Sequence, residues 1–246
     1  MKRYAWQIAL ASCLAVLSAG VYLLHYALFR DARHIFLYLV GDIAFLPVQV
    51  LFVTLIVDRL LNRREKLAML KKMNMVIGVF FSEAGAALLR DLNAFHAGGG
   101  VPARELLVTE GWSDRDFAEA ARRFRGRGPE IECRAGDLAG LKAFLAEKRM
   151  FLVSLLENPN LLEHETFTDL LWAVFHLAEE LAARERVDCL PESDAAHLAG
   201  DIRRAYGLLV TEWLSYMRHL KRDYPYLFSL AARMNPFDPA ASPAVR

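Results

Sequence analysis

The chain has 246 residues, enough for one or two domains, and 55% of them are hydrophobic, more than the roughly 45–50% typical of soluble domains. Its net charge of +1 conceals an uneven distribution: residues 1–72 carry ten Lys/Arg and four Asp/Glu, whereas residues 73–246 carry twenty and twenty-five. Because nucleic-acid binding requires clustered Lys/Arg to neutralise phosphates, the acidic second part argues against nucleic acid as a partner. The three cysteines, Cys13, Cys133 and Cys189, form no CxxC motif and are expected to be free thiols.

Two long apolar runs, residues 5–29 and 35–57, dominate the N-terminal part of the chain. Each exceeds the roughly 20 residues that a helix needs to cross the hydrocarbon core of a bilayer, where the backbone must satisfy its own hydrogen bonds. A cleaved signal peptide would also begin with basic residues, but its apolar core spans only about 7–15 residues. The short link of residues 30–34 therefore predicts an antiparallel transmembrane hairpin, which we assign to residues 1–58.

Basic residues predict the orientation of this hairpin, since short loops rich in Lys/Arg stay in the cytoplasm. The link between the runs contains only Arg30 and Arg33, whereas six basic residues follow the second run and two precede the first. We therefore expect a two-span protein of the inner (plasma) membrane with both termini in the cytoplasm. The six basic residues that follow the second run are expected to contact anionic lipid head groups. They are Arg59, Arg63, Arg64, Lys66, Lys71 and Lys72.

Polar residues interrupt the second apolar run. A carboxylate within a membrane span is costly and normally faces protein or water, so Asp42 needs a partner. Folding the hairpin at its link places Tyr22 level with Asp42 and His25 one turn away, which predicts a structural hydrogen bond between the two helices. The alternative is an ion or proton path, because Asp42 and Gln49 are seven residues apart and share a helix face.

Beyond the membrane runs, apolar residues recur every three to four positions, which predicts an all-α fold without strands. The second membrane helix is expected to continue as a long juxtamembrane helix over residues 59–96. A cytoplasmic helical bundle is expected over residues 97–234. Residues 235–246, rich in proline and small side chains, are expected to form a flexible tail.

Capping residues indicate where the helices of the bundle begin. Ser113 and Asp116 form a variant of the capping box, and Asp137 and Ser193 are expected to cap two further helices. Pro225 is expected to begin a short final helix, since proline is favoured in the first turn. The preceding helices are expected over about residues 114–124, 137–157, 162–186 and 193–223.

A cluster of arginines ends the helix expected over residues 114–124. These side chains either grip phosphate or lipid head groups, or they form a solvated turn whose charge the following Glu130 and Glu132 offset. The residues are Arg122, Arg123, Arg125 and Arg127.

One constellation has the composition of a metal site. Histidines and carboxylates recur on one broad face of the helix expected over residues 162–186, and the next long helix carries His197 and Asp201 four residues apart. Two helices that each offer a histidine and a carboxylate can hold a transition metal between them. A solvated face with capping residues accounts for the same pattern. The candidate ligands are His164, Glu165, His176, Glu179, His197 and Asp201.

The chain lacks the motifs GxxxxGK[ST], GxGxxG, GxSxG and HExxH. We therefore expect a non-enzymatic, membrane-anchored binding or regulatory module that self-associates and contacts anionic lipid, with a protein partner as one option. The first alternative is an oligomeric ion channel or transporter subunit with Asp42 and Gln49 facing the pore. The second alternative is a metal-dependent enzyme that uses His164, His176 and His197. The sequence identifies no cofactor.

Overall fold

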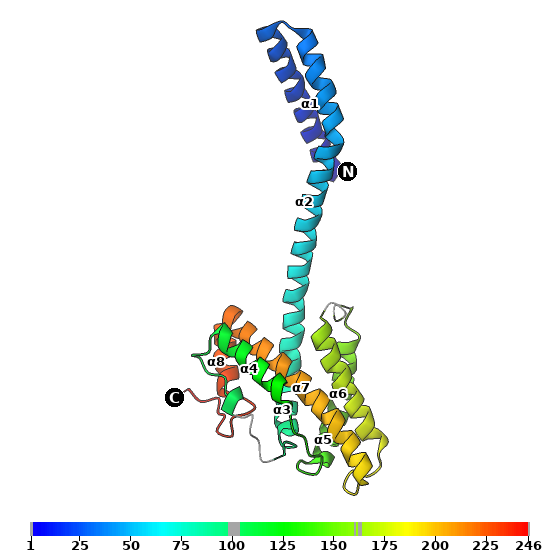
Figure 1. The fold of residues 1–246 in the computed structure, drawn as a ribbon, viewed down its shortest axis with the longest axis vertical. Coiled ribbons are helices and arrows are strands. Elements are labelled where there is room, and N and C mark those ends of the chain that lie inside the picture. The colour runs from blue at the N-terminus through cyan, green and yellow to red at the C-terminus, as the bar shows by residue number, and fades with distance from the viewer. Residues whose placement is uncertain (1, 98–103, 160, 162–163, 246) are drawn as a thin grey trace. The chain divides into compact units, whose positions relative to one another are not determined.

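The computed structural model describes residues 2–97, 104–159, 161 and 164–245 (Figure 1). The fold is all-helical as expected, and the described residues contain no β-strand; their one extended pairing is a bridge between His96 and Ile131. Contacts divide the chain into two units, Met1–Glu65 and Lys66–Arg246. The elements are α1 (Lys2–Phe29), α2 (Ala32–Phe80), the π-helical turn η1 (Phe81–Gly85), α3 (Ala86–Asn93), the 3₁₀ turn η2 (Arg104–Leu106), α4 (Asp114–Arg127), α5 (Leu138–Leu156), α6 (Glu165–Ala183), α7 (Glu192–Asp223) and α8 (Pro225–Arg233).

The first unit is an antiparallel hairpin of α1 and the N-terminal part of α2 (Figure 1). Arg30 adopts a left-handed φ of 47°, and its N–H donates to the carbonyl of Tyr26 at 2.9 Å, which closes α1. Asp31 then begins α2, because its Oδ1 accepts from the N–H of His34 at 3.2 Å, as a capping carboxylate does. The link is therefore residues 30 and 31, shorter than the expected 30–34.

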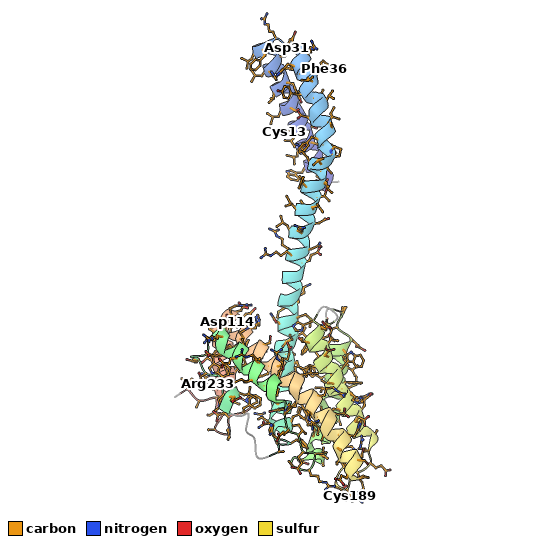
Figure 2. All side chains as sticks on the ribbon, viewed as in Figure 1. Cys13, Asp31, Phe36, Asp114, Cys189 and Arg233 are labelled. Atoms are coloured by element: carbon orange, nitrogen blue, oxygen red, sulfur yellow. The ribbon has the colours of Figure 1, made fainter. Side chains whose placement is uncertain are left out.

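Over Trp6–Phe29 and Ala32–Glu65 the two helices are long and apolar enough to cross a membrane. Nearly all of their described side chains are exposed, as Figure 2 shows around Cys13 and Phe36. Apolar side chains exposed along the full length of two helices are unfavourable in water, so their composition fits lipid or the surface of another protein chain.

The expected juxtamembrane helix is interrupted by a π-helical turn. α2 extends to Phe80, η1 follows, and α3 ends at Asn93 rather than near residue 96. Aromatic packing occupies this turn: the Phe81 ring stacks on Tyr216 at 4.9 Å between centroids. Gly85 is required here, because a Cβ at this position would lie 2.7 Å from ring carbons of Phe80 and Phe81. Insertion of one residue into the helical ladder turns these large side chains toward the bundle.

The core of the second unit forms around α7, which packs against α3, α4, α6 and α8, while α5 packs against α6. The apolar stripe expected on α6 is buried, as are the matching positions of α7. The buried residues of α6 include Phe167, Leu170, Leu171, Val174, Leu177 and Leu181, and those of α7 include Leu198, Ile202, Ala205, Leu209, Trp213 and Leu220. Burial of these stripes against one another supplies the main driving force for folding.

Helix starts agree with the predicted caps at two positions and differ at one. Ser113 and Asp116 form the reciprocal capping box, and the Asp137 side chain accepts from the N–H of Gly140. The expectation for Ser193 was wrong: α7 begins two residues earlier, with Pro191 at the N-cap and Ser193 exposed inside the first turn. The fixed φ of proline pre-orders the start of this helix without a side-chain hydrogen bond.

The tail was expected to be flexible, but its first residues are part of the core. Asn235 and Phe237 are both buried, and the Asn235 amide donates to the carbonyl of Leu106 at 3.0 Å. The Phe237 ring packs edge-on against Trp213 at 5.1 Å between centroids. A buried amide and an aromatic ring hold this segment against the bundle, which a composition of proline and small residues did not reveal.

Candidate functional site

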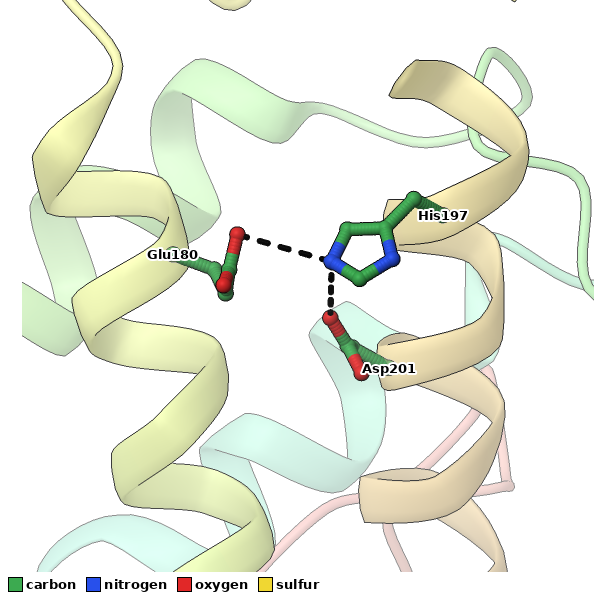
Figure 3. A group of neighbouring side chains, drawn as sticks. All are labelled: Glu180, His197 and Asp201. Carbon is green, nitrogen blue, oxygen red and sulfur yellow. Dashed lines mark ion pairs between the residues drawn. The ribbon is translucent and has the colours of Figure 1, made fainter. Parts of the chain in front are cut away.

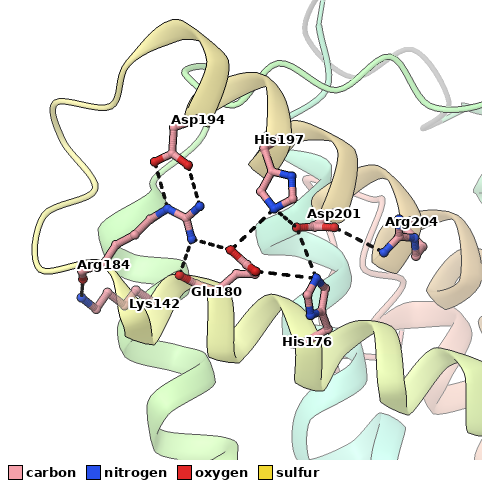
Figure 4. A network of polar contacts seen from close by, with 8 residues as sticks. All are labelled: Lys142, His176, Glu180, Arg184, Asp194, His197, Asp201 and Arg204. Carbon is pink, nitrogen blue, oxygen red and sulfur yellow. Dashed lines mark hydrogen bonds and ion pairs between the residues drawn. The ribbon is translucent and has the colours of Figure 1, made fainter.

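The candidate site lies between α6 and α7, which are joined by the short connection of residues 184–191 and pack side by side (Figure 4). His176 and Glu180 are four residues apart on α6, and His197 and Asp201 are four residues apart on α7. Residues with this spacing lie one above the other on a helix face. The four side chains of this α6–α7 cluster therefore face one another across the two helices.

Figure 3 shows the nitrogen and oxygen atoms of Glu180, His197 and Asp201 converging. His197 Nε2 lies 3.3 Å from Asp201 Oδ2 and 3.6 Å from Glu180 Oε2. His176 Nε2 lies 3.7 Å from Asp201 Oδ2 and 3.9 Å from Glu180 Oε1. Within the described part of the chain, Glu180, His197 and Asp201 form the one group of three or more potential ligands whose atoms all lie within 4.8 Å of one another.

Asp201 is the buried member of the cluster, with 5% of its side chain exposed. Its Oδ1 accepts from Arg204 Nη1 at 3.3 Å. Its Oδ2 is buried and has no hydrogen-bond donor among the described residues, although two histidine nitrogens lie nearby. A buried carboxylate oxygen without a donor is costly, so this atom fits a positively charged neighbour.

Arg184 positions the second carboxylate of the cluster. Its Nη1 donates to Glu180 Oε2 at 2.7 Å (Figure 4). Its Nε and Nη2 donate to Asp194 Oδ2 and Oδ1 at 3.0 and 2.6 Å. Hydrogen bonding to Arg184 holds the pKa of Glu180 below its usual range, and it lowers the pKa of Asp194 in the same way. Lys142 in turn donates to the Arg184 carbonyl. Glu180 is therefore kept anionic and in place.

Three of the six ligands predicted from the sequence, His176, His197 and Asp201, lie in the cluster. Glu179 does not, because it lies 3.6 Å from Arg149 of α5, and Glu165 is exposed in the first turn of α6. Glu180 lies on the same face of the predicted helix as His176, but the sequence prediction did not include it among the candidate ligands. The sequence feature that could have identified Glu180 as a ligand is the repeated spacing, in which a carboxylate follows a histidine by four residues on both helices.

His164 belongs to a separate, partly buried cluster with Glu212, so among the described residues it does not join His176 and His197 in the three-histidine site expected for an enzyme. His164 Nδ1 accepts from the N–H of Phe167 and thereby caps α6, while Nε2 lies 4.0 Å from Glu212. Thr166 Oγ1 donates to Glu212 at 3.1 Å. Burial raises the pKa of Glu212, although His164 and Thr166 oppose this shift. His164 and Glu212 line a small polar cavity of about 130 Å³ that His219 also lines.

The basic residues expected to contact head groups are exposed where their side chains are described. This holds for Arg59, Arg63, Arg64 and Lys72; the side chains of Lys66, Lys71 and Arg127 lie outside the described residues. Arg122, Arg123 and Arg125 are also exposed, but two of them are engaged within their own helix. Arg123 pairs with Glu119, and Arg125 Nε donates to the Ala121 carbonyl at 3.2 Å.

The hydrogen bond predicted between Asp42 and the first helix is not seen among the described residues. Asp42 and Gln49 are exposed on α2, and in the described residues no hydrogen bond or ion pair joins Asp42 to Tyr22 or His25. His25 instead packs against His34, with ring centroids 5.8 Å apart. The short link at Arg30 and Asp31 brings the two histidines together. The prediction had matched residues of the two helices by counting from a longer link, so it did not anticipate this contact.

Comparison with known proteins divides the chain as the structure does. The family described as "MJ1433, N-terminal helical domain" matches residues 2–61, and the one described as "Uncharacterized protein MJ1433, C-terminal helical domain" matches residues 69–233. Protein MJ1433 of Methanocaldococcus jannaschii is 43% identical over 238 residues, which cover 96% of this chain and 94% of that protein. No solved structure matches. The chain therefore belongs to the MJ1433 family, with both of its helical domains present.

Proposed function

We propose that this protein is a membrane-anchored binding and regulatory module, whose helical unit receives a positively charged ligand at the α6–α7 cluster and acts by occupancy rather than by catalysis. The observation that carries the proposal is the buried Oδ2 of Asp201, which has no hydrogen-bond donor among the described residues and lies near two histidine nitrogens. A cation placed there would offset the cost of burying this carboxylate.

The two apolar helices anchor the module as a two-span hairpin in the plasma membrane, with both termini in the cytoplasm. The charge distribution supports this orientation, because basic residues concentrate after the second span. The exposed Arg59, Arg63, Arg64 and Lys72 contact anionic head groups, and each such contact contributes about 1 kcal/mol near a charged membrane surface.

The exposed Asp42 supports self-association of the anchor. An ionised carboxylate that faces lipid costs about 2.5–3.5 kcal/mol on the scale of translocon insertion. Contact with a second copy of the chain, or with water held between copies, offsets this cost. A specific observation thus also favours a second candidate function, an oligomeric channel or transporter subunit in which Asp42 and Gln49 line the path.

Thermal unfolding of the full-length protein in detergent tests the binding function. Divalent metal ions, spermidine and an arginine-rich peptide are added separately to the wild type, to Asp201→Asn and to Asp169→Asn, a control that removes an exposed carboxylate on α6. At least one cation should raise the melting temperature of the wild type and the control but not that of Asp201→Asn. If no cation distinguishes Asp201→Asn from the control, the proposed binding function is wrong.

Ion flux into liposomes tests the second candidate. A path lined by Asp42 predicts flux through the wild type that Asp42→Asn abolishes while the fold is retained. The control is Ile43→Val, a change of one methylene group at the neighbouring exposed position. Equal flux for Asp42→Asn and the wild type, or no flux for either, excludes the channel.

A further inference from the structure

We infer that the ligand of the α6–α7 cluster is a single divalent transition metal ion of the class of Zn²⁺ or Co²⁺, bound by Nε2 of His176 and His197 and by carboxylate oxygens of Glu180 and Asp201. This inference rests on the proposed binding function and names its ligand. Each helix contributes one histidine and, one turn further, one carboxylate, so an ion bound between them would join α6 to α7.

The donor set selects the class of ion. Two imidazole nitrogens and two carboxylate oxygens suit Zn²⁺ and its first-row neighbours, which accept mixed nitrogen and oxygen ligands. Mg²⁺ and Ca²⁺ prefer oxygen ligands alone, so the histidines disfavour them. Cu(I) and iron–sulfur clusters require thiolate or thioether ligands, and the cluster contains no sulfur.

Potential donor atoms of Glu180, His197 and Asp201 all lie within 4.8 Å of one another, and the His176 side chain must move toward them to complete the set of four ligands. Metal–ligand bonds of about 2.0–2.2 Å place neighbouring ligands of a tetrahedral ion about 3.3 Å apart. The separations between the histidine Nε2 atoms and the carboxylate oxygens run from 3.3 to 3.9 Å, with His176 facing Oε1 and His197 facing Oε2 of Glu180. The widest of these separations must therefore shorten by about 0.6 Å to reach the spacing of ligands around a tetrahedral ion. The histidine side chains are about half exposed, so they have the freedom to make this movement.

Each carboxylate is held by an arginine that is not itself a ligand. Arg184 bonds Glu180 Oε2, and Arg204 bonds Asp201 Oδ1. This arrangement is typical of metal centres, where the groups that ligate the ion are oriented by hydrogen bonds from a surrounding layer of residues. Within the described part of the chain, Asp201 Oδ2 is left without a donor, 3.3 Å from His197 Nε2 and 3.7 Å from His176 Nε2.

The number of hydrogen-bond acceptors that meet in the α6–α7 cluster favours a divalent metal ion over a shared proton. When both histidines are neutral and carry their proton on Nδ1, both Nε2 atoms have lone pairs, so the cluster presents acceptors from all four side chains to one small region. A proton shared between a histidine and a carboxylate satisfies one pair at a time. A divalent ion satisfies all four side chains at once and neutralises both carboxylates.

The test uses the full chain in detergent, stripped with a chelator, with the two exposed cysteines changed (Cys13→Ser and Cys189→Ser) so that thiolates do not compete. Co²⁺ is titrated while visible absorption is recorded, and Zn²⁺ binding is measured by calorimetry. We expect one Co²⁺ per chain, with the absorption of a low-coordinate site. Asp201→Asn and His197→Gln should each weaken binding at least tenfold, and Arg204→Gln about tenfold.

The matched control is Glu179→Gln, which removes a carboxylate adjacent to the cluster on the same helix and should change affinity less than twofold. Substoichiometric binding, or equal affinity for the wild type, Asp201→Asn and His197→Gln, would overturn the metal assignment. The two levels of the proposal remain separable. If spermidine or the arginine-rich peptide stabilises the chain through Asp201 while metals do not, the metal is wrong and the binding function stands; if no cation does so, both fail.

Discussion

Arg184 and Asp194 form a two-point ion pair across the connection between α6 and α7, with Nε–Oδ2 and Nη2–Oδ1 distances of 3.0 and 2.6 Å. The same guanidinium bonds Glu180 with Nη1. One side chain therefore joins the end of α6 to the start of α7 and orients a carboxylate of the candidate site. The planar fork of arginine matches this geometry in a way that lysine does not.

Replacing Arg184 by glutamine should destabilise the helical unit by about 1–2 kcal/mol, because hydrogen bonds to charged groups are lost from a side chain that is 17% exposed. Chemical denaturation of the full chain measures this change. Arg186→Gln is the matched control, since Arg186 pairs with Asp188 in the same connection but both side chains are mostly exposed. Similar unfolding midpoints for the two variants would contradict the role assigned to Arg184.

Phe237→Ala should destabilise the same unit by about 3–5 kcal/mol, the range for truncating a buried aromatic side chain. The loss comes from the contact with Trp213 and from the cavity left behind. Val245→Ala, eight residues further along the tail at an 82% exposed position, should have no measurable effect. If the two variants unfold at the same denaturant concentration, the tail is not part of the core.

Glu212 predicts a specific dependence of stability on pH. Burial raises its pKa above the ordinary 4.5, so the folded state holds the proton more tightly than the unfolded chain does. The resulting stabilisation is fully present below pH 4.5 and is lost as the pH rises through the raised pKa. His164, His219, Arg218 and Arg222 line the same cavity as Glu212.

Glu212→Gln should remove this term, so the wild type should lose stability relative to the variant as the pH rises from 4.5. Denaturation midpoints across the acidic to neutral range measure the difference. Glu185→Gln, an exposed change in the connection after α6, should follow the wild-type curve. Parallel curves for the wild type and Glu212→Gln would show that Glu212 titrates alike in the folded and unfolded states.

Asp42→Leu should weaken self-association about tenfold, because a lipid-facing leucine no longer requires a polar partner from a second chain. A difference of 1.4 kcal/mol, well within the cost of exposing a carboxylate to lipid, corresponds to that factor at room temperature. Energy transfer between labelled copies in liposomes measures the association. Ile43→Leu is the control at the neighbouring exposed position. Unchanged energy transfer for Asp42→Leu would mean that the Asp42 carboxylate reaches the membrane–water interface and does not contact a second chain.

Cysteine labelling tests the proposed orientation of the hairpin. In a background with Cys13, Cys133 and Cys189 replaced, a cysteine at Ala32 should react with an impermeant maleimide added outside intact cells, and one at Ser242 should react only after the membrane is opened. Both positions are exposed or half-buried, so access depends on the membrane rather than on packing. Reaction of the Ser242 position from outside would reverse the orientation.

Local sequence determined the helices and their faces. The stripe from Phe167 to Leu181 follows helical periodicity, and its residues are buried in α6. Ser113 and Asp116 cap α4 through hydrogen bonds between residues only three positions apart. Such a cap depends on neighbouring residues alone and can be predicted from the local sequence. The two apolar runs likewise form helices of sufficient length for a membrane. These features are predictable because they depend on spacing within one helix.

Only the tertiary structure decided which side chains meet. Glu179 and Glu180 lie three and four residues after His176, so both could share its helix face. Because α5 and α7 pack on different sides of α6, Glu179 pairs with Arg149 and Glu180 with His197. The burial of Phe237 likewise depends on Trp213, 24 positions earlier in the chain. Such contacts are set by how helices cross and in which register they pack, and this depends on the whole core rather than on any local pattern.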